Sequence, residues 1–270
     1  MALPASYPRS RFRPCGNLGT TVVFASALVL TAGCVDTVVG APLATRDPSG
    51  VVGVGPSIVK VLPTDAELSA ALRDDMSSHG ISPTVGGIDA LPDGVRNTNE
   101  ASEIQCLGVV HPYMRKVYEN SMVRAAATRS WDDFDDTNKH LGHWYSVRAG
   151  ALALASPADA QALFGAFVQQ WQQCRGKTMT VYHAAAGSSD ERHQITDVRA
   201  SDTMLTAVVL MSQPPAHATP SPVQRAVGVA MNCIADVDFS DSGWRAGDAV
   251  SPDQAAAVTQ LMLSKITGAT

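Results

Sequence analysis

The sequence lacks the short motifs that carry the common enzyme chemistries. Gly-x-Ser-x-Gly, a Walker phosphate loop and His-Glu-x-x-His are all missing from its 270 residues. Cys106 with His111 would offer a nucleophile and a base, but a disulfide at Cys106 would remove the thiol. We therefore predict that the chain is not an enzyme, has no catalytic residues and needs no cofactor.

Recognisable metal-binding patterns are also missing. No Cys-x-x-Cys occurs, so the sequence gives no support to a zinc knuckle or a thioredoxin-like redox pair. The acidic run 132–136 lacks the spaced ligands of a calcium loop, and His140 with His143 lacks the glutamate of a zinc protease. A solvated acidic turn beside surface histidines is the favoured interpretation, and we predict no metal site.

Acidic residues are absent before Asp36, whereas three arginines, at positions 9, 11 and 13, precede the apolar stretch 18–34. This stretch ends in Ala32-Gly33-Cys34 and is shorter than the roughly 20 apolar residues that a membrane span needs. A basic start, a short apolar run and small residues before a cysteine are typical of a bacterial lipoprotein signal. We predict a signal peptide over 1–33 and lipidation, with palmitate among the acyl chains, at Cys34; a membrane-spanning anchor is the alternative.

Removal of residues 1–33 would leave 17 basic against 25 acidic residues, a net charge of −8. Such acidity argues against a nucleic-acid partner, which requires a basic surface. It also argues against a polybasic attachment to anionic lipid, so the acyl chain would hold the protein at the membrane. We therefore place the chain on the extracytoplasmic face of the cell membrane, anchored through Cys34, with a small ligand or an envelope protein as its partner.

Three cysteines remain once Cys15 and Cys34 are assigned to the signal and the lipid. Outside the cytoplasm, such widely spaced cysteines indicate one disulfide and one leftover thiol. Cys233 falls on the apolar side of a predicted strand and is most simply a buried free thiol. That leaves Cys106 with Cys174, and the alternative pairing is Cys174 with Cys233.

The pattern of the remaining chain predicts a folded domain over 58–270 behind a flexible tether, residues 34–57, rich in Gly, Pro and Ser. Capping signals and 3.6-residue periodicity predict helices that begin at Thr64, Ser156 and Ser251, and a helical piece over 102–119 that Pro112 interrupts. Residues 77–101 are predicted as a long irregular loop. Strands are expected at 122–131, 144–155, 177–184, 192–200, 204–211 and 223–239. Their short connections indicate an antiparallel sheet, so the fold class is α/β (α+β), with about five or six strands.

The last predicted strand, 223–239, carries the candidate ligand-binding residues. Its alternation places Gln224, Asn232 and Asp236 on the polar side. Asn232 and Asp236 would be separated by about 13 Å along the strand, so they could line one groove without gripping the same atom. The alternative is that each side chain hydrogen-bonds a neighbouring loop.

Several sequence pieces together resemble one family. They are Leu62-Pro63 with Glu67-Leu68, Cys106 before a helix with Tyr118, the helix that ends Trp171-Gln172-Gln173-Cys174, Gln224-Arg225-Ala226-Val227, and Asn232 with Asp236-Val237. This set resembles the PknH-type extracytoplasmic sensor domain, which occurs in a mycobacterial serine/threonine kinase and in envelope lipoproteins without a kinase.

The resemblance implies an antiparallel sheet with helices packed around a cleft, which is proposed to bind an unidentified ligand, and it implies a Cys106–Cys174 bridge. The chain departs from the kinase's domain at two positions, since Val223 stands where a cysteine is expected and Cys233 replaces a valine. We expect a lipid-anchored envelope lipoprotein with a non-catalytic ligand-binding or sensor-like domain. The alternative is a structural or lipid-carrying lipoprotein that acts through protein or lipid partners.

Overall fold

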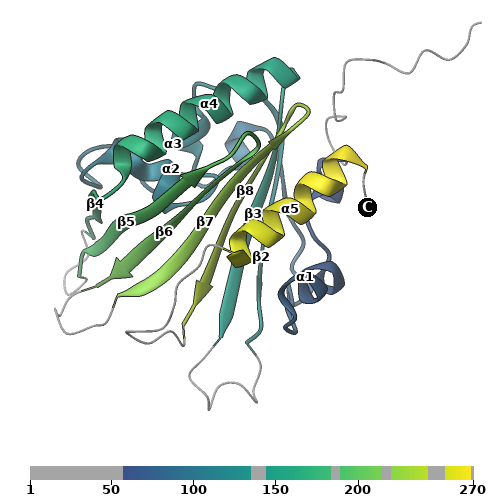
Figure 1. Cartoon of the computed structure of the whole chain (residues 1–270), viewed down its shortest axis with the longest axis horizontal. Coiled ribbons are helices and arrows are strands. Elements are labelled where there is room, and N and C mark those ends of the chain that lie inside the picture. Colours follow the sequence, from purple (N-terminus) through teal and green to yellow (C-terminus); the bar gives the residue numbers. More distant parts are fainter. Residues whose placement is uncertain (1–56, 135–143, 184–188, 214–219, 243–252, 269–270) are drawn as a thin grey trace, which may run out of the picture. The chain divides into compact units, whose positions relative to one another are not determined.

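One antiparallel sheet of eight strands, in the order β1-β2-β3-β8-β7-β6-β5-β4, organises the fold (Figure 1). The computed structural model describes residues 57–134, 144–183, 189–213, 220–242 and 253–268. The strands are β1 (Thr84–Gly86), β2 (Val123–Asp132), β3 (Tyr145–Leu154), β4 (Thr178–Val181), β5 (Glu191–Ala200), β6 (Met204–Ser212), β7 (Ser221–Ala230) and β8 (Cys233–Asp241). The predicted α+β class and antiparallel pairing are confirmed, with more strands than the five or six expected.

Five α-helices and three short 3₁₀ turns surround this sheet in the described part of the chain. They are η1 (Ile58–Val61), α1 (Asp65–Leu72), η2 (Ile88–Ala90), η3 (Ile104–Cys106), α2 (Leu107–Val110), α3 (Arg115–Tyr118), α4 (Pro157–Cys174) and α5 (Asp253–Thr267). The predicted signal peptide, Cys34 and almost all of the predicted tether lie outside the described residues, as do His140 and His143. No helix in the described ranges is long and apolar enough to cross a membrane.

Local capping signals set the starts of α1 and α4 as predicted, whereas the third predicted start, Ser251, lies outside the described residues. The Thr64 hydroxyl accepts the Glu67 amide at 3.2 Å, and the Glu67 carboxylate accepts the Thr64 amide at 2.7 Å, which completes a capping box at α1. α1 ends at Leu72, because Arg73 adopts the left-handed conformation with φ 59°. At α4, Ser156 accepts the Asp159 amide and Pro157 occupies the first turn.

The predicted strand 223–239 is wrong, because the chain turns back in the middle of it. Met231, with φ 50°, and Asn232 form a two-residue turn, and Ala230 pairs with Cys233 across the resulting β7–β8 hairpin. The turn reverses the side-chain alternation expected for one continuous strand. Val227 and Val229 therefore face one side of the sheet and Cys233 the other.

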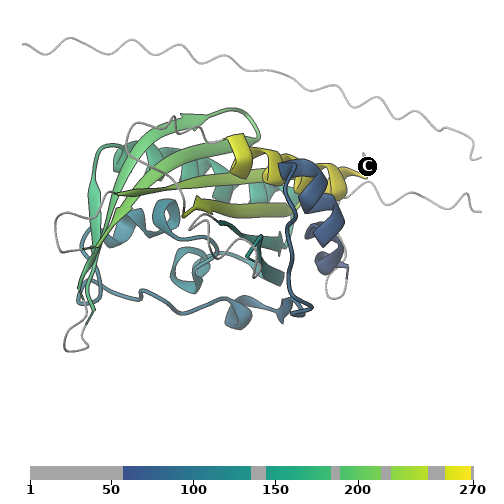
Figure 2. The ribbon, with the colours of Figure 1, turned by 90° about the horizontal axis from the view of Figure 1, so that it is seen from below.

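Each face of the sheet buries its own apolar core. α5, α1 and η1 cover the face with Ala226, Ala235 and Val237. α4, together with α2 and η3, covers the opposite face (Figures 1 and 2). On that face Trp171 and Phe167 pack among aliphatic side chains. On α5 the large apolar side chains that face the sheet are Val258, Met262, Leu263 and Ile266.

A segment that we call the strap, residues 87–101, connects the two edges of the sheet. It starts directly after the edge strand β1 and ends at Ala101, which forms a β-bridge with Val181 of the other edge strand, β4. The Tyr182 amide donates to the Glu100 carbonyl at 2.7 Å at this junction. In Figure 2 the strap passes along the side of the sheet on which α2 and α3 lie. The predicted irregular loop is thus largely correct, although β1 and η2 within it were not foreseen.

Candidate functional site

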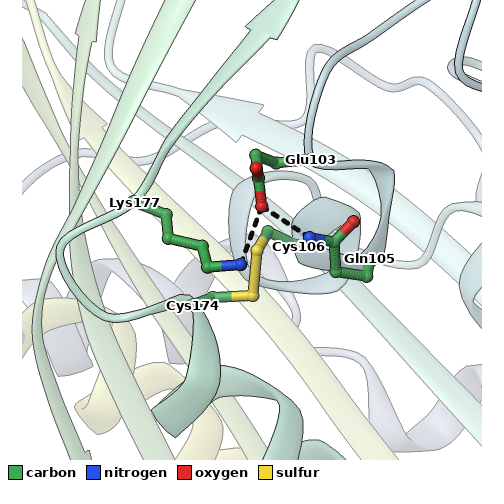
Figure 3. Close-up of a disulfide and its surroundings, with 5 residues drawn as sticks. All are labelled: Glu103, Gln105, Cys106, Cys174 and Lys177. Atoms are coloured by element: carbon green, nitrogen blue, oxygen red, sulfur yellow. Dashed lines mark hydrogen bonds and ion pairs between the residues drawn. A yellow bond between two sulfur atoms is a disulfide. The ribbon is translucent and has the colours of Figure 1, made fainter. Parts of the chain in front are cut away.

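The disulfide links Cys106 to Cys174, with the two Cα atoms 5.7 Å apart, and so joins η3 to the end of α4 (Figure 3). Beside it, the Lys177 ammonium lies 2.8 Å from the Glu103 carboxylate, and the Gln105 amide donates to that same carboxylate (Figure 3). The predicted Cys106–Cys174 pairing is confirmed. The alternative pairing of Cys174 with Cys233 is wrong, and the bridge removes Cys106 as a partner for His111 in catalysis.

Cys233 is buried and forms no disulfide, as predicted. Burial raises the pKa of its thiol to about 12, so the reactive thiolate is suppressed at neutral pH. The side chain packs on the α5 face of the sheet among apolar neighbours. Its surroundings are those of a small core side chain.

Asp236 is the centre of a buried polar network on the α4 face. One carboxylate oxygen accepts the Tyr113 amide and the Tyr118 hydroxyl, each at 2.7 Å, and the other accepts the Arg225 guanidinium at 2.7 Å. Arg225 is fully buried and also donates to the carbonyls of Gly108 and Val109 in α2. These bonds fasten α2, α3 and the residues between them to the centre of the sheet.

The link between α2 and α3 is a strained break at the predicted proline. His111 is extended, as expected of a residue before Pro112, and Tyr113 is left-handed with φ 41°. The Tyr113 ring packs directly on β3, where a Cβ added to Gly150 would lie 2.7 Å from the ring. The Asp236 bond to the Tyr113 amide and this ring contact fix the positions of the neighbouring His111 and Met114.

Gln224 and Asn232 lie apart from this network. The Gln224 carbonyl oxygen accepts the amides of Gln254 and Ala255, at 3.0 and 3.3 Å, and so caps the start of α5 on the opposite face of the sheet. The Asn232 side chain, in the β7–β8 turn, donates to the Leu154 carbonyl at 3.0 Å. The structure therefore does not bring the three predicted ligand residues together, and each makes hydrogen bonds within the fold.

A different set of residues lines a cleft of about 390 Å³ beneath the strap. Its apolar lining includes Val95, Met114 and Val181. The polar lining comes from the strap, the α2–α3 link, β3 and the β4–β5 hairpin, and comprises Glu100, His111, Arg148, Tyr182, His183 and Glu191. The Arg148 guanidinium forms a two-nitrogen ion pair with the buried Asp238 carboxylate on β8. The cleft is thus lined by four segments that are far apart in the sequence.

Three histidines gather around one carboxylate at this cleft. The His183 and His193 rings approach the two Glu191 oxygens, at 3.5 and 3.4 Å, and the His111 ring stands edge-on to His193 with centroids 5.1 Å apart. Burial, followed by the neighbouring His193 and the cations of Arg148 and Arg225, lowers the pKa of His111 to about 3. His111 is therefore a neutral ring at physiological pH.

Other parts of the described ranges offer weaker candidates for a functional site. No group of three or more His, Cys, Asp or Glu side chains there is arranged to hold a metal ion. Two further hollows, of about 280 and 220 Å³, adjoin α4 and share Asn120 in their lining. Neither gathers the histidines and carboxylates of the cleft beneath the strap.

Sequence reasoning singled out Asp236 as a ligand residue and, of the cleft residues, named only His111, as a possible base for Cys106. Arg148 carried a readable signal, because it is a charged residue inside an otherwise apolar strand. Glu191 and His193 gave no sequence signal of a functional site, since alternating polar residues are ordinary on a strand. Their proximity to His111 is a product of the folded chain alone.

Comparisons with known proteins bear on the fold. The family model described as "PknH-like extracellular domain" matches residues 25–265. The crystal structure of the extracellular domain of PknH from Mycobacterium tuberculosis has 21% sequence identity and a TM-score of 0.60, over 78% of this chain and 94% of that chain. A putative uncharacterized protein from Mycobacterium smegmatis, an Rv0999 ortholog, has 14% identity and a TM-score of 0.33 over 78% and 95% of the two chains. No curated protein matches the sequence.

Proposed function

The chain belongs to the family of PknH-like extracellular domains, and from this premise we propose that it is a lipid-anchored, non-catalytic domain that binds a small ligand outside the cytoplasmic membrane. The lipid would be attached at Cys34, and the ligand would occupy the cleft beneath the strap. The observation that carries the proposal is the convergence of charged, imidazole and aromatic side chains from four separate segments on one open hollow.

The construction of the cleft walls supports a binding role. The Cys106–Cys174 bridge and the Asp236–Arg225 pair hold the α2–α3 wall against the sheet, and the Ala101–Val181 bridge holds the end of the strap. Preformed walls reduce the entropy that a ligand must remove on binding. Charged groups in the lining favour a small polar ligand over a long acyl chain, because burial against hydrocarbon would remove their hydration.

Export and anchoring are supported by separate observations. A structural disulfide is typical of a protein that folds in an oxidising compartment. The Arg-rich start, the short apolar run and Ala32-Gly33-Cys34 supply the pattern of a lipoprotein signal. Metabolic labelling with palmitate in the native host is expected to label the wild type and not Cys34→Ala. An unlabelled wild type, or an equally labelled variant, would contradict anchoring at Cys34.

Ligand binding in the cleft is tested by native mass spectrometry of the chain purified from its own cell envelope. We expect a small molecule to remain bound to the wild type and to be lost in Val181→Trp, which fills the cleft. Thr178→Trp is the matched control, since Thr178 is exposed on the same strand and points away from the core. Retention of the same molecule by Val181→Trp would place its binding site elsewhere, and an empty wild type would count against the ligand proposal.

A further inference from the structure

The cleft contains one carboxylate that no cationic side chain neutralises. Glu191 lines the cleft with a side chain that is 30% exposed, and its ion-pair neighbours are the His183 and His193 rings. No lysine or arginine in the described part of the chain lies within ion-pair distance of it. Its charge therefore faces the hollow without a fixed counter-charge.

The other charged groups in the lining are already paired. The Arg148 guanidinium is bound to the Asp238 carboxylate, and the Glu100 carboxylate accepts the Arg96 Nε at 2.9 Å and its Nη2 at 2.5 Å. These pairs contribute little net charge to the cleft, whereas Glu191 contributes a full negative charge. The cleft is therefore electrostatically suited to a positively charged group.

The nearby imidazoles leave this charge in place. The His193 ring is the largest of the influences that lower the pKa of Glu191, which stays ionised at physiological pH. His111 is held neutral by burial, because its pKa lies at about 3. The His193 and His183 rings both lower the pKa of Glu191, so an ionised carboxylate remains directed at the hollow.

The rest of the lining fits the apolar body that an organic cation carries. Met114, Val95 and Val181 supply aliphatic surface, and Tyr182, which is 44% exposed, supplies an aromatic ring. An ammonium group gains from a carboxylate and from an aromatic face together. We propose that the cleft recognises a small organic ammonium compound, with its cationic head at Glu191 and its apolar body against Met114 and Val181. This assignment rests on the proposed ligand-binding function and names the chemical class of the ligand.

The test uses three probes of the same length and different charge: n-butylammonium, n-butanol and n-butyrate. Each is titrated into the ¹⁵N-labelled chain at neutral pH, and the amide shifts of residues 182 and 191 are followed. We expect saturable shifts with butylammonium, and a dissociation constant at least about fivefold lower than for butanol or butyrate, as for one added ion pair at a partly exposed site.

Two variants separate a charge effect from a change of fold. Glu191→Gln should weaken butylammonium binding by about fivefold while leaving butanol binding unchanged. Glu119→Gln, at an exposed glutamate paired with Lys116 outside this cleft, should leave both unchanged. The amide spectrum of each variant shows directly whether the fold is retained.

The outcomes distinguish the ligand class from the ligand-binding function. If butyrate or butanol binds the cleft as tightly as butylammonium, the ammonium assignment is wrong although the cleft binds ligands. If butylammonium binds with equal affinity to Glu191→Gln, the assignment to Glu191 is wrong. If none of the three probes shifts the cleft amides, the ammonium class is overturned, and the native mass spectrum of the envelope-purified chain decides separately whether another ligand is bound.

Discussion

Asp236, which the sequence suggested as a ligand contact, instead positions the α2–α3 link that lines the cleft. Its carboxylate is almost fully buried and joins Tyr113, Tyr118 and Arg225, so it determines where the α2–α3 link lies. The two interpretations left open for Asp236 were ligand contact and internal hydrogen bonding, and the structure shows internal bonds. Its influence on the cleft is exerted through the backbone of Tyr113.

Replacing Asp236 by Asn should destabilise the fold strongly. The substitution leaves the Arg225 guanidinium buried without its counter-charge, and breaking one partner of a buried ion pair costs about 3–5 kcal/mol. Urea denaturation measures the change in the free energy of unfolding. Asp197→Asn is the control, because its pair with Arg199 is exposed and should cost less than about 1 kcal/mol. Equal losses in the two variants would contradict this role of Asp236.

His111 should make the fold sensitive to acid. Its pKa of about 3 in the folded chain lies below the ordinary value of 6.5, so the unfolded chain binds the extra proton between these two values. The free energy of unfolding then decreases as the pH falls from about 6.5 towards 3, by at most about 1.4 kcal/mol per pH unit.

Replacing His111 by Asn should remove this contribution. We expect a shallower decrease in stability between pH 6.5 and pH 4.5 than in the wild type, measured by urea denaturation at each pH. His79→Asn, at an exposed histidine beside Asp132, controls for the general effect of acid on the carboxylates. An unchanged pH slope in His111→Asn would show that its neutral state does not contribute to stability.

At the scale of elements, the packing of α5 on β7 depends on the missing side chain at Gly228. A Cβ at this position would lie 2.7 Å from Thr259 Cγ2 and 2.9 Å from Leu263 Cδ1, both on α5. Gly228→Ala should therefore displace the helix and lower stability by about 1–3 kcal/mol, as overpacking does. Gly165→Ala, inside α4 with open space around its Cβ position, should stabilise by up to about 1 kcal/mol. Thermal unfolding compares the two, and a Gly228→Ala variant at least as stable as the wild type would rule out the close contact.

The elements that the sequence predicted well are those with local signals. The capping box at Thr64, the Ser156-Pro157 start of α4 and the proline break at Pro112 each depend on neighbouring residues. The β7–β8 turn was missed because Met231 and Asn232 include no glycine and both flanking strands are buried on two faces. The length of the predicted strand was itself a warning, since strands seldom exceed about 10 residues.

At the scale of the whole molecule, the disulfide joins parts of the chain that are 68 residues apart. Closing a loop of this length should contribute about 4 kcal/mol to the free energy of unfolding on the chain-entropy model. The double variant Cys106→Ser, Cys174→Ser should lose that amount in urea denaturation. Reductant should lower the stability of the wild type and leave the double variant unchanged. A wild type unaffected by complete reduction would contradict this contribution.

The fold class and the bridge could be predicted from the sequence, whereas the cleft could not. Its walls come from the strap, the α2–α3 link, Arg148 on β3 and the β4–β5 hairpin. No periodicity relates His111 to Glu191: the Tyr113 contacts with Asp236 and Gly150 hold His111 in place, and Glu191 lies at the start of β5. The candidates Gln224 and Asp236 fell on opposite faces of the sheet because the β7–β8 turn lies between them.

The central claim is that this cleft is the ligand site, and a crystal structure of the domain purified from its own envelope tests it most directly. The account predicts electron density for one small molecule beneath the strap, in contact with Glu191 and Tyr182. Density for a bound molecule at the hollows along α4, with only water beneath the strap, would contradict it.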